Sequence, residues 1–75
     1  MIFTTALKRI GGNVSMRRMS WPAKAHVSFY EKRYDEQRAV TVMGLRIRDE
    51  RGREREFEPS DADLNAIDWN LMEEL

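Results

Sequence analysis

Cysteine is absent from the 75-residue sequence, and histidine occurs once, as His26. Without cysteine the chain has neither disulfides nor thiolate metal sites. One histidine is too few for a metal site built from imidazole ligands. Very small domains usually gain stability from such staples or from a partner chain. Because so short a chain buries only a thin core, self-association is the expected source of the missing burial.

Long apolar runs and an excess of one charge are missing as well. Thirteen Lys and Arg residues balance thirteen Asp and Glu residues, so the formal net charge is zero. This balance argues against a DNA- or RNA-binding protein, which usually carries a basic excess. No segment approaches the about 20 apolar residues that cross a bilayer, and residues 1–5 do not have the character of a secretory signal. We therefore expect a cytoplasmic protein that contacts no membrane.

Motifs that carry chemistry are also lacking. Gly11-Gly12 belongs to neither of the common Gly-rich phosphate-binding patterns. His26 with scattered Ser and Asp residues does not indicate a Ser-His-Asp triad. Asp61 and Asp63 are expected to point apart on a short helical turn. We therefore predict no enzymatic activity, no catalytic residues, no cofactor and no bound metal.

The first third of the chain predicts one helix and two strands. Phe3, Leu7 and Ile10 form an apolar stripe at helical spacing, and Thr4 or Thr5 is expected to cap this short helix. Alternating side chains then predict strands over residues 14–20 and 25–30. Trp21-Pro22 separates the strands because proline has no N–H for a sheet ladder. Residues 31–38 are polar, and we interpret them as a loop.

A β-hairpin is the best-defined element that the sequence predicts. Residues 39–48 and 53–57 form its strands, and residues 50–52 form its loop, where Gly52 is free to adopt a positive φ. Four cross-strand pairs then fall into register, each contributing about 0.2–1 kcal/mol. These pairs are Asp49 with Arg53, Arg48 with Glu54, Arg46 with Glu56, and Leu45 with Phe57.

The C-terminal third predicts a short helix and a last strand. Residues 59–64 form a capped helical turn, in which Ser60 is the N-cap and Asp63 completes a capping box. Residues 67–72 alternate as a strand, and residues 73–75 form a solvated tail. The expected fold is one α+β domain over residues 1–75. It consists of a small twisted antiparallel sheet of four or five strands with one N-terminal helix on one face.

Two sets of charged residues raise the question of ligand binding. Basic and acidic residues alternate in the predicted hairpin, which favours a charge-paired ribbon over a phosphate-binding surface. Trp21 follows Arg17-Arg18 and precedes Lys24. An indole flanked by cations suits a nucleotide, with the base on the ring and the phosphates on the cations. A core tryptophan beside surface arginines explains the same residues.

Two blocks of residues resemble a known family. The first is Phe3-x-x-Ala6-Leu7 through Gly12-x-Val14-x-x-Arg17-Arg18-x-x-Trp21, and the second is Pro59-Ser60-x-x-Asp63-Leu64-x-Ala66-x-Asp68-Trp69. In these blocks the chain is similar to very small phage and prophage proteins, formerly a domain of unknown function. The family is now named after the second type of Thoeris anti-defence protein. Its members commonly carry a tryptophan just before the Pro-Ser element, where this chain has Phe57-Glu58.

The resemblance implies a homotetrameric sponge that traps cyclic nucleotide immune signals between its subunits without cleaving them. The implied ligands are cyclic ADP-ribose derivatives of the Thoeris system and, for some members, cyclic dinucleotides. We expect Trp21 to stack on a base, with Arg18 and Lys24 near phosphates and Arg17 as a further ligand-binding residue. Ser60 and Asp63 either contact the ribose or base edge or only cap their helix, and Asp68 and Trp69 anchor the last strand or an oligomer contact. The alternative function is a small phage protein that blocks a host protein through its charged hairpin.

Overall fold

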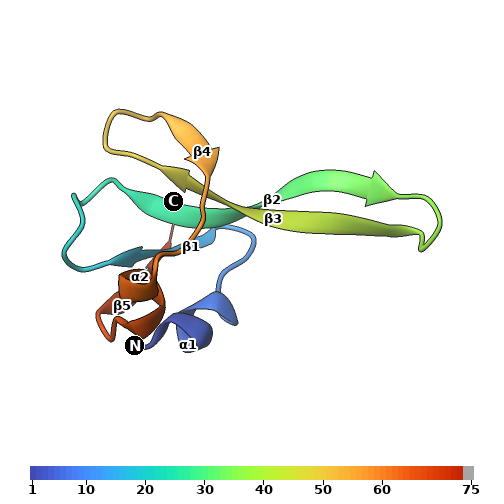
Figure 1. Cartoon of the computed structure of the whole chain (residues 1–75). Helices are drawn as coiled ribbons and strands as arrows, with labels where there is room; N and C mark the ends of the chain where they lie inside the picture. Colours follow the sequence, from blue (N-terminus) through green and yellow to red (C-terminus); the bar gives the residue numbers. More distant parts are fainter. Residues whose placement is uncertain (74–75) are drawn as a thin grey trace.

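A five-stranded antiparallel sheet forms the body of the protein, with strand order β4-β3-β2-β1-β5. The computed structural model describes residues 1–73 (Figure 1). This architecture confirms the predicted α+β class, with one antiparallel sheet and a helix near the N-terminus. The elements are α1 (Phe3–Leu7), β1 (Val14–Arg18), β2 (His26–Asp35), β3 (Val40–Arg48), β4 (Glu54–Glu56), α2 (Asp61–Asn65) and β5 (Trp69–Glu73).

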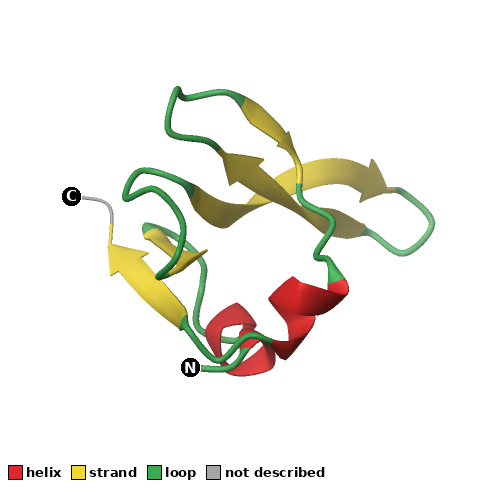
Figure 2. Ribbon diagram, turned by 60° about the vertical axis from the view of Figure 1, so that its left-hand side comes forward, coloured by secondary structure: helices red, strands yellow, loops and turns green. Residues whose placement is uncertain are grey.

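Both helices lie on one side of the sheet (Figure 2). We call this side the helix side and the other the helix-free face. Strand residues alternate between them, so Met16 of β1 and Val27 of β2, which pair across the sheet, are both fully buried on the helix side. Trp69 completes this core, with its ring centroid 5.3 Å from that of Phe3. The buried core cluster comprises Phe3, Ala6, Ile10, Met16, Val27, Phe57 and Trp69.

The predicted hairpin between β3 and β4 is confirmed in its register. Arg46 lies opposite Glu56 and Arg48 opposite Glu54, while the Phe57 N–H donates to the Leu45 carbonyl at 2.9 Å. Gly52 adopts the expected positive φ of 81°. The ion pairs differ in part from the prediction, because Arg46 reaches diagonally to Glu54 at 2.8 Å.

The turn of this hairpin is held by Asp49 rather than by a pair of side chains. The Asp49 carboxylate accepts the backbone N–H groups of Arg51 and Arg53, both at 2.9 Å. The bond from the Arg53 N–H is the main reason why the pKa of Asp49 lies below its ordinary value. The predicted pairing of Asp49 with the Arg53 side chain is therefore replaced by a turn-closing contact with its backbone.

The N-terminal helix starts earlier than predicted and lacks a side-chain cap. Ile2 occupies the N-cap position, and Thr4 and Thr5 both lie inside the helix, so the predicted threonine cap is wrong. The start of the chain is held by β5 instead. The Met1 ammonium donates to the carbonyls of Ile67 (3.1 Å) and Trp69 (2.8 Å), and the Trp69 N–H donates to the Met1 carbonyl at 3.0 Å.

The predicted loop at residues 31–38 is wrong over most of its length, because β2 continues to Asp35. It pairs with β3 past a β-bulge between Glu31 and Arg33. This outer half of the β2–β3 hairpin, residues 31–43, is called the ribbon below. It projects away from the body at the right of Figure 1 and makes the molecule elongated, with extents of 40 × 26 × 22 Å.

The C-terminal elements match their predictions closely. Ser60 caps α2, and the reciprocal bonds of the capping box join it to Asp63: the Asp63 N–H donates to Ser60 Oγ (3.2 Å) and the Ser60 N–H to Asp63 Oδ2 (3.1 Å). The last strand begins at Trp69 rather than at residue 67 and includes Glu73, which was predicted to belong to the tail. The other predicted tail residues, 74 and 75, lie outside the described residues.

Candidate functional site

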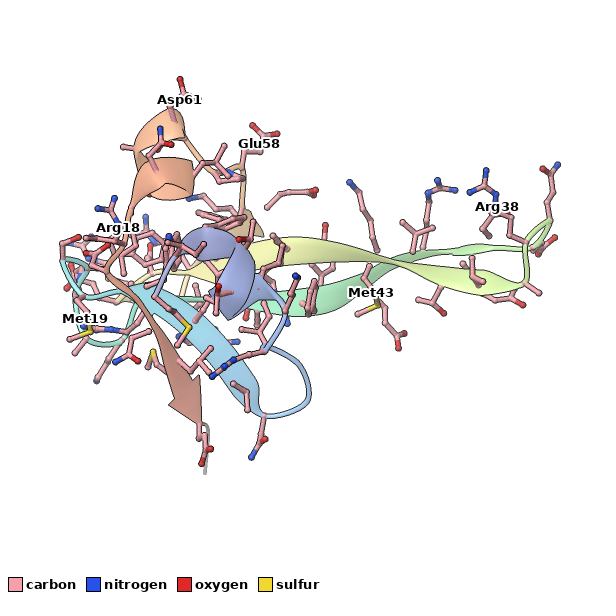
Figure 3. The ribbon with its side chains drawn as sticks, turned by 90° about the horizontal axis from the view of Figure 1, so that it is seen from below. Arg18, Met19, Arg38, Met43, Glu58 and Asp61 are labelled. Carbon is pink, nitrogen blue, oxygen red and sulfur yellow. The ribbon has the colours of Figure 1, made fainter. Side chains whose placement is uncertain are left out.

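The predicted ligand-binding residues do not gather at one place. Arg17 and Arg18 are neighbours in β1, and alternation sends their side chains to opposite faces of the sheet. Arg18 lies on the helix side, close to α2 in Figure 3, together with Ser60 and Asp63. Arg17 belongs to the helix-free face. The structure therefore divides the predicted residues between the two faces of the sheet.

On the helix side, Arg18 joins two carboxylates. Its Nε donates to Asp68 Oδ1 at 3.0 Å, and its Nη1 donates to Asp63 Oδ1 at 3.3 Å. The bond to Asp68 is the main reason why the pKa of Arg18 is raised, and the same bond lowers the pKa of Asp68. Two acids surround one guanidinium here, so Arg18 is poorly placed to bind a phosphate. Its position indicates that it holds α2 and the start of β5 against β1.

Trp21 lies at the edge of the aromatic core rather than on an open platform. Its ring contacts Trp69 edge-to-face at 5.3 Å and Phe57 at 6.0 Å between centroids. Trp69 is almost fully buried, and its indole N–H donates to the Asp63 carbonyl at 2.8 Å. These contacts stabilise the core. The half-buried Trp21 ring keeps a partly exposed surface.

The helix-free face carries two adjoining hollows. The smaller has a volume of about 170 Å³ and is lined by Gly12, His26, Ser28, Phe29, Arg46, Arg48 and Glu54. The larger, about 340 Å³, is lined by Ala23, Lys24, His26, Arg48, Asp49, Glu50, Gly52 and Met72. His26 and Arg48 line both hollows. Lys24 is the one predicted ligand residue that lines either of them.

Positive charge predominates around the smaller hollow. Arg46 and Arg48 both form ion pairs with Glu54, so one carboxylate faces two guanidiniums. The Arg48 hydrogen bond is the main reason why the pKa of Glu54 is lowered. Lys24 lines the larger hollow and Arg17 lines neither, and both form no ion pair within residues 1–73. This arrangement favours an anion over a neutral or cationic ligand.

Tyr30 fixes the position of Arg46 beside the hollow. The Arg46 guanidinium carbon lies 5.6 Å from the centre of the Tyr30 ring, and the Tyr30 hydroxyl donates to Glu56 at 2.7 Å. The ring lies over Gly44, where a Cβ atom would come within 2.8 Å of it. Glu56 also accepts from Lys32 at 2.9 Å. With Glu56 held by these two groups, Glu54 is left as the carboxylate shared by Arg46 and Arg48.

Counting charges along the hairpin did not reveal Arg46 and Arg48 as site residues. The hairpin charges balance along the sequence, and in the sheet Glu54 and Glu56 lie on the same face as their partners Arg48 and Arg46. Arg55 pairs with Ile47 and faces the helix side, whereas Arg46 and Arg48 face the hollow. Applying the two-residue alternation of strands to the predicted register would have found this separation.

No family model, no curated protein and no solved structure matches this chain. Among the described residues, no group of three or more His, Asp or Glu side chains is arranged to hold a metal ion. No helix within residues 1–73 has the length and apolar character needed to cross a membrane.

Proposed function

We propose that this protein is a phage or prophage anti-defence protein that binds a cyclic nucleotide immune signal and sequesters it without cleaving it. It acts in the cytoplasm of the bacterial host, as a homo-oligomer and most simply as a tetramer. Two lines of support meet in this proposal. One is the resemblance of residues 3–21 and 59–69 to the anti-defence family. The other, which carries the proposal, is the pair of adjoining hollows on the helix-free face, of which the smaller is lined by two arginines and one glutamate.

The chemistry of these hollows suits the phosphates of a cyclic nucleotide. Arg46, Arg48 and Lys24 line them with charged donors, and charge-assisted bonds to phosphate are stronger than bonds between neutral groups. Ser28 adds a hydroxyl on the same face. The phosphate contacts are thus assigned to Arg46 and Arg48, in place of the predicted Arg18. Trp21 contributes to the site indirectly. Its contacts with Phe57 and Trp69 on the helix side fix the start of the loop that carries Lys24.

The size of the hollows favours a site shared between copies of the chain. Ligand pockets that enclose a small molecule usually measure about 300–1,000 Å³. The hollow of about 170 Å³ falls below this range, and that of about 340 Å³ lies at its lower end. A cyclic dinucleotide is too large for either one alone. A second copy placed over the helix-free face would supply the missing walls.

Isothermal titration with a panel of cyclic dinucleotides and cyclic ADP-ribose derivatives tests the proposal. At least one member should bind, and Arg46→Gln and Arg48→Gln should each weaken binding about tenfold or more, because each removes a charged phosphate donor. Arg55→Gln is the matched control, since it makes the same change in the same hairpin on the opposite face. The ligand should be recovered intact after the complex is denatured. Absence of binding by the whole panel, or recovery of a cleaved product, contradicts the proposal.

The second candidate is a module that binds and blocks a host protein. The observation that favours it is the exposed outer edge of the sheet, where all three residues of β4 (Glu54–Glu56) are exposed. An exposed edge strand can pair with a strand of another protein. A stable complex with a host protein, combined with no binding to any cyclic nucleotide, would favour this candidate.

A further inference from the structure

The ribbon carries large apolar side chains into solvent. Tyr34 is 60% exposed, and Val40 and Met43 are each 48% exposed. A two-stranded ribbon with nothing packed on it is only marginally stable. Figure 3 shows the ribbon extending away from both helices, with Met43 and Arg38 labelled along it. Neither helix supplies the cover that these side chains lack.

The β-bulge decides which ribbon side chains share a face. Met43 has the same alternation as Leu45 and Ile47, which pack against the core on the helix side. Past the bulge, Tyr34 pairs with Thr41, so Tyr34 joins Met43 on this face. Without the bulge, alternation along β2 would place Arg33 there instead. Tyr34 and Met43 therefore extend the apolar helix-side face beyond the helices, whereas Val40 points to the opposite side.

The exposed area of the chain is larger than its mass predicts. The surface measures 5609 Å², against about 4,800 Å² expected for a compact monomer of 8.9 kDa. The radius of gyration is 12.9 Å, against about 11 Å expected for this length. The excess of about 800 Å² equals the area that each partner buries in a standard protein interface.

We propose that the helix-side face of the ribbon, centred on Tyr34 and Met43, is the surface through which one copy of this chain packs against a second copy around a two-fold axis. Tyrosine and methionine are both enriched at interfaces. Residues 31–43 contain three acidic and three basic side chains, so two ribbons approach without net repulsion. The neutral ribbon offers no complementary electrostatic potential to a strongly charged partner. The proposal does not depend on the identity of any ligand.

Molar mass measured by light scattering after size exclusion tests the proposal on the full chain without ligand. The wild-type protein should elute at twice the monomer mass of 8.9 kDa or a higher multiple. Met43→Glu and Tyr34→Glu should shift the mass toward 8.9 kDa. Val40→Glu is the matched control, because Val40 has the same 48% exposure in the same strand but faces the other way. It should keep the wild-type mass.

A labelling experiment guards against variants that fail to fold. The chain has no cysteine, so Met43→Cys and Val40→Cys each introduce a single thiol. Maleimide labelling of Met43→Cys should slow several-fold between dilute and concentrated protein, while labelling of Val40→Cys stays constant. A monomeric wild-type chain at concentrations of about 100 μM overturns the proposal. So do equal mass shifts for Met43→Glu and Val40→Glu, or a labelling rate at position 43 that is independent of concentration.

Discussion

Arg18 and Arg48 lie on opposite faces of the same sheet. At Arg18 one guanidinium meets two carboxylates, whereas at Arg48 two guanidiniums meet at one carboxylate. Arg18 joins two acids, Asp63 and Asp68, and its side chain is only 23% exposed. Arg48 shares Glu54 with Arg46 and is 49% exposed. The charges of the helix side therefore join α2 and β5 to β1, whereas on the helix-free face two guanidiniums meet at one carboxylate. Substitutions on the two faces should affect different properties.

The largest effect is expected on the helix side, for Trp69→Ala. The indole is 1% exposed and contacts the rings of Phe3, Trp21 and Phe57. Removing a buried aromatic ring of this size costs about 3–5 kcal/mol, which is most of the stability of a marginal small domain. Urea unfolding followed by circular dichroism should show a largely unfolded variant. Ile67→Ala is the exposed control, since Ile67 is 77% exposed, and it should stay folded; a folded Trp69→Ala protein would show that the helix side does not carry the core.

Arg18→Gln should lower the Tm by a few degrees. The substitution leaves the half-buried Asp63 and Asp68 without their shared cation, and unpaired carboxylates are costly when solvent is partly excluded. Differential scanning fluorimetry measures the change. Arg17→Gln, one residue earlier and on the other face, should leave the Tm nearly unchanged. Equal effects of the two variants would mean that the faces do not divide their roles as described.

Acid should weaken the helix side through Asp68. Its pKa is lowered, chiefly by the hydrogen bond from Arg18, so between the folded and unfolded pKa values the unfolded chain binds more protons. The stabilising contribution is complete above the ordinary carboxyl pKa of about 4 and is lost as the pH falls through the lowered value. The Tm measured between pH 6 and pH 2 should fall most steeply below pH 4. Asp68→Asn should start lower at pH 6 and fall less steeply; an unchanged slope would exclude this carboxylate as the cause.

Ser60→Ala should cost about 1 kcal/mol, the usual value of a helix N-cap. The Ser60 hydroxyl accepts the Asp63 N–H, and this bond is lost. Chemical denaturation measures the loss. If Ser60 only caps α2, the affinity for a cyclic nucleotide should stay within about twofold of wild type. A large loss of affinity in a folded Ser60→Ala variant would indicate that the ligand binds on the helix side.

The smallest effect on stability is expected for Arg48→Gln. An exposed ion pair contributes little, so the free energy of unfolding should change by less than about 0.5 kcal/mol. The same variant should lose nucleotide affinity, which separates binding from folding. A strongly destabilised Arg48→Gln protein would show that the helix-free face also holds the fold.

Residues with a clear periodicity or turn chemistry were predicted well from the sequence. Gly52 and the opposed charges fixed the register of β3 and β4, and Ser60 with Asp63 predicted the capping box. In these cases the partner residues lie no more than ten positions apart in the sequence. Local patterns therefore suffice for local contacts.

The role of Arg18 was harder to predict because its partners are distant along the chain. Arg18 meets Asp68 fifty positions away, and no local pattern distinguishes such an arginine from a free one. The outer half of β2 was missed for a different reason. Residues 31–35 contain four charged side chains, and a strand exposed on both faces shows no apolar alternation.

The position of Trp69 in the chain sets an order of events during synthesis. Every other buried core residue, from Phe3 to Phe57, leaves the ribosome before it. The ribbon and the hairpin of β3 and β4 depend on neighbouring residues and can form early, whereas Met1, Phe3 and Trp21 must wait for the last strand. Contacts of such long separation slow folding. The nascent chain therefore presents its strands well before its core closes, and a chain cut before residue 69 should not fold.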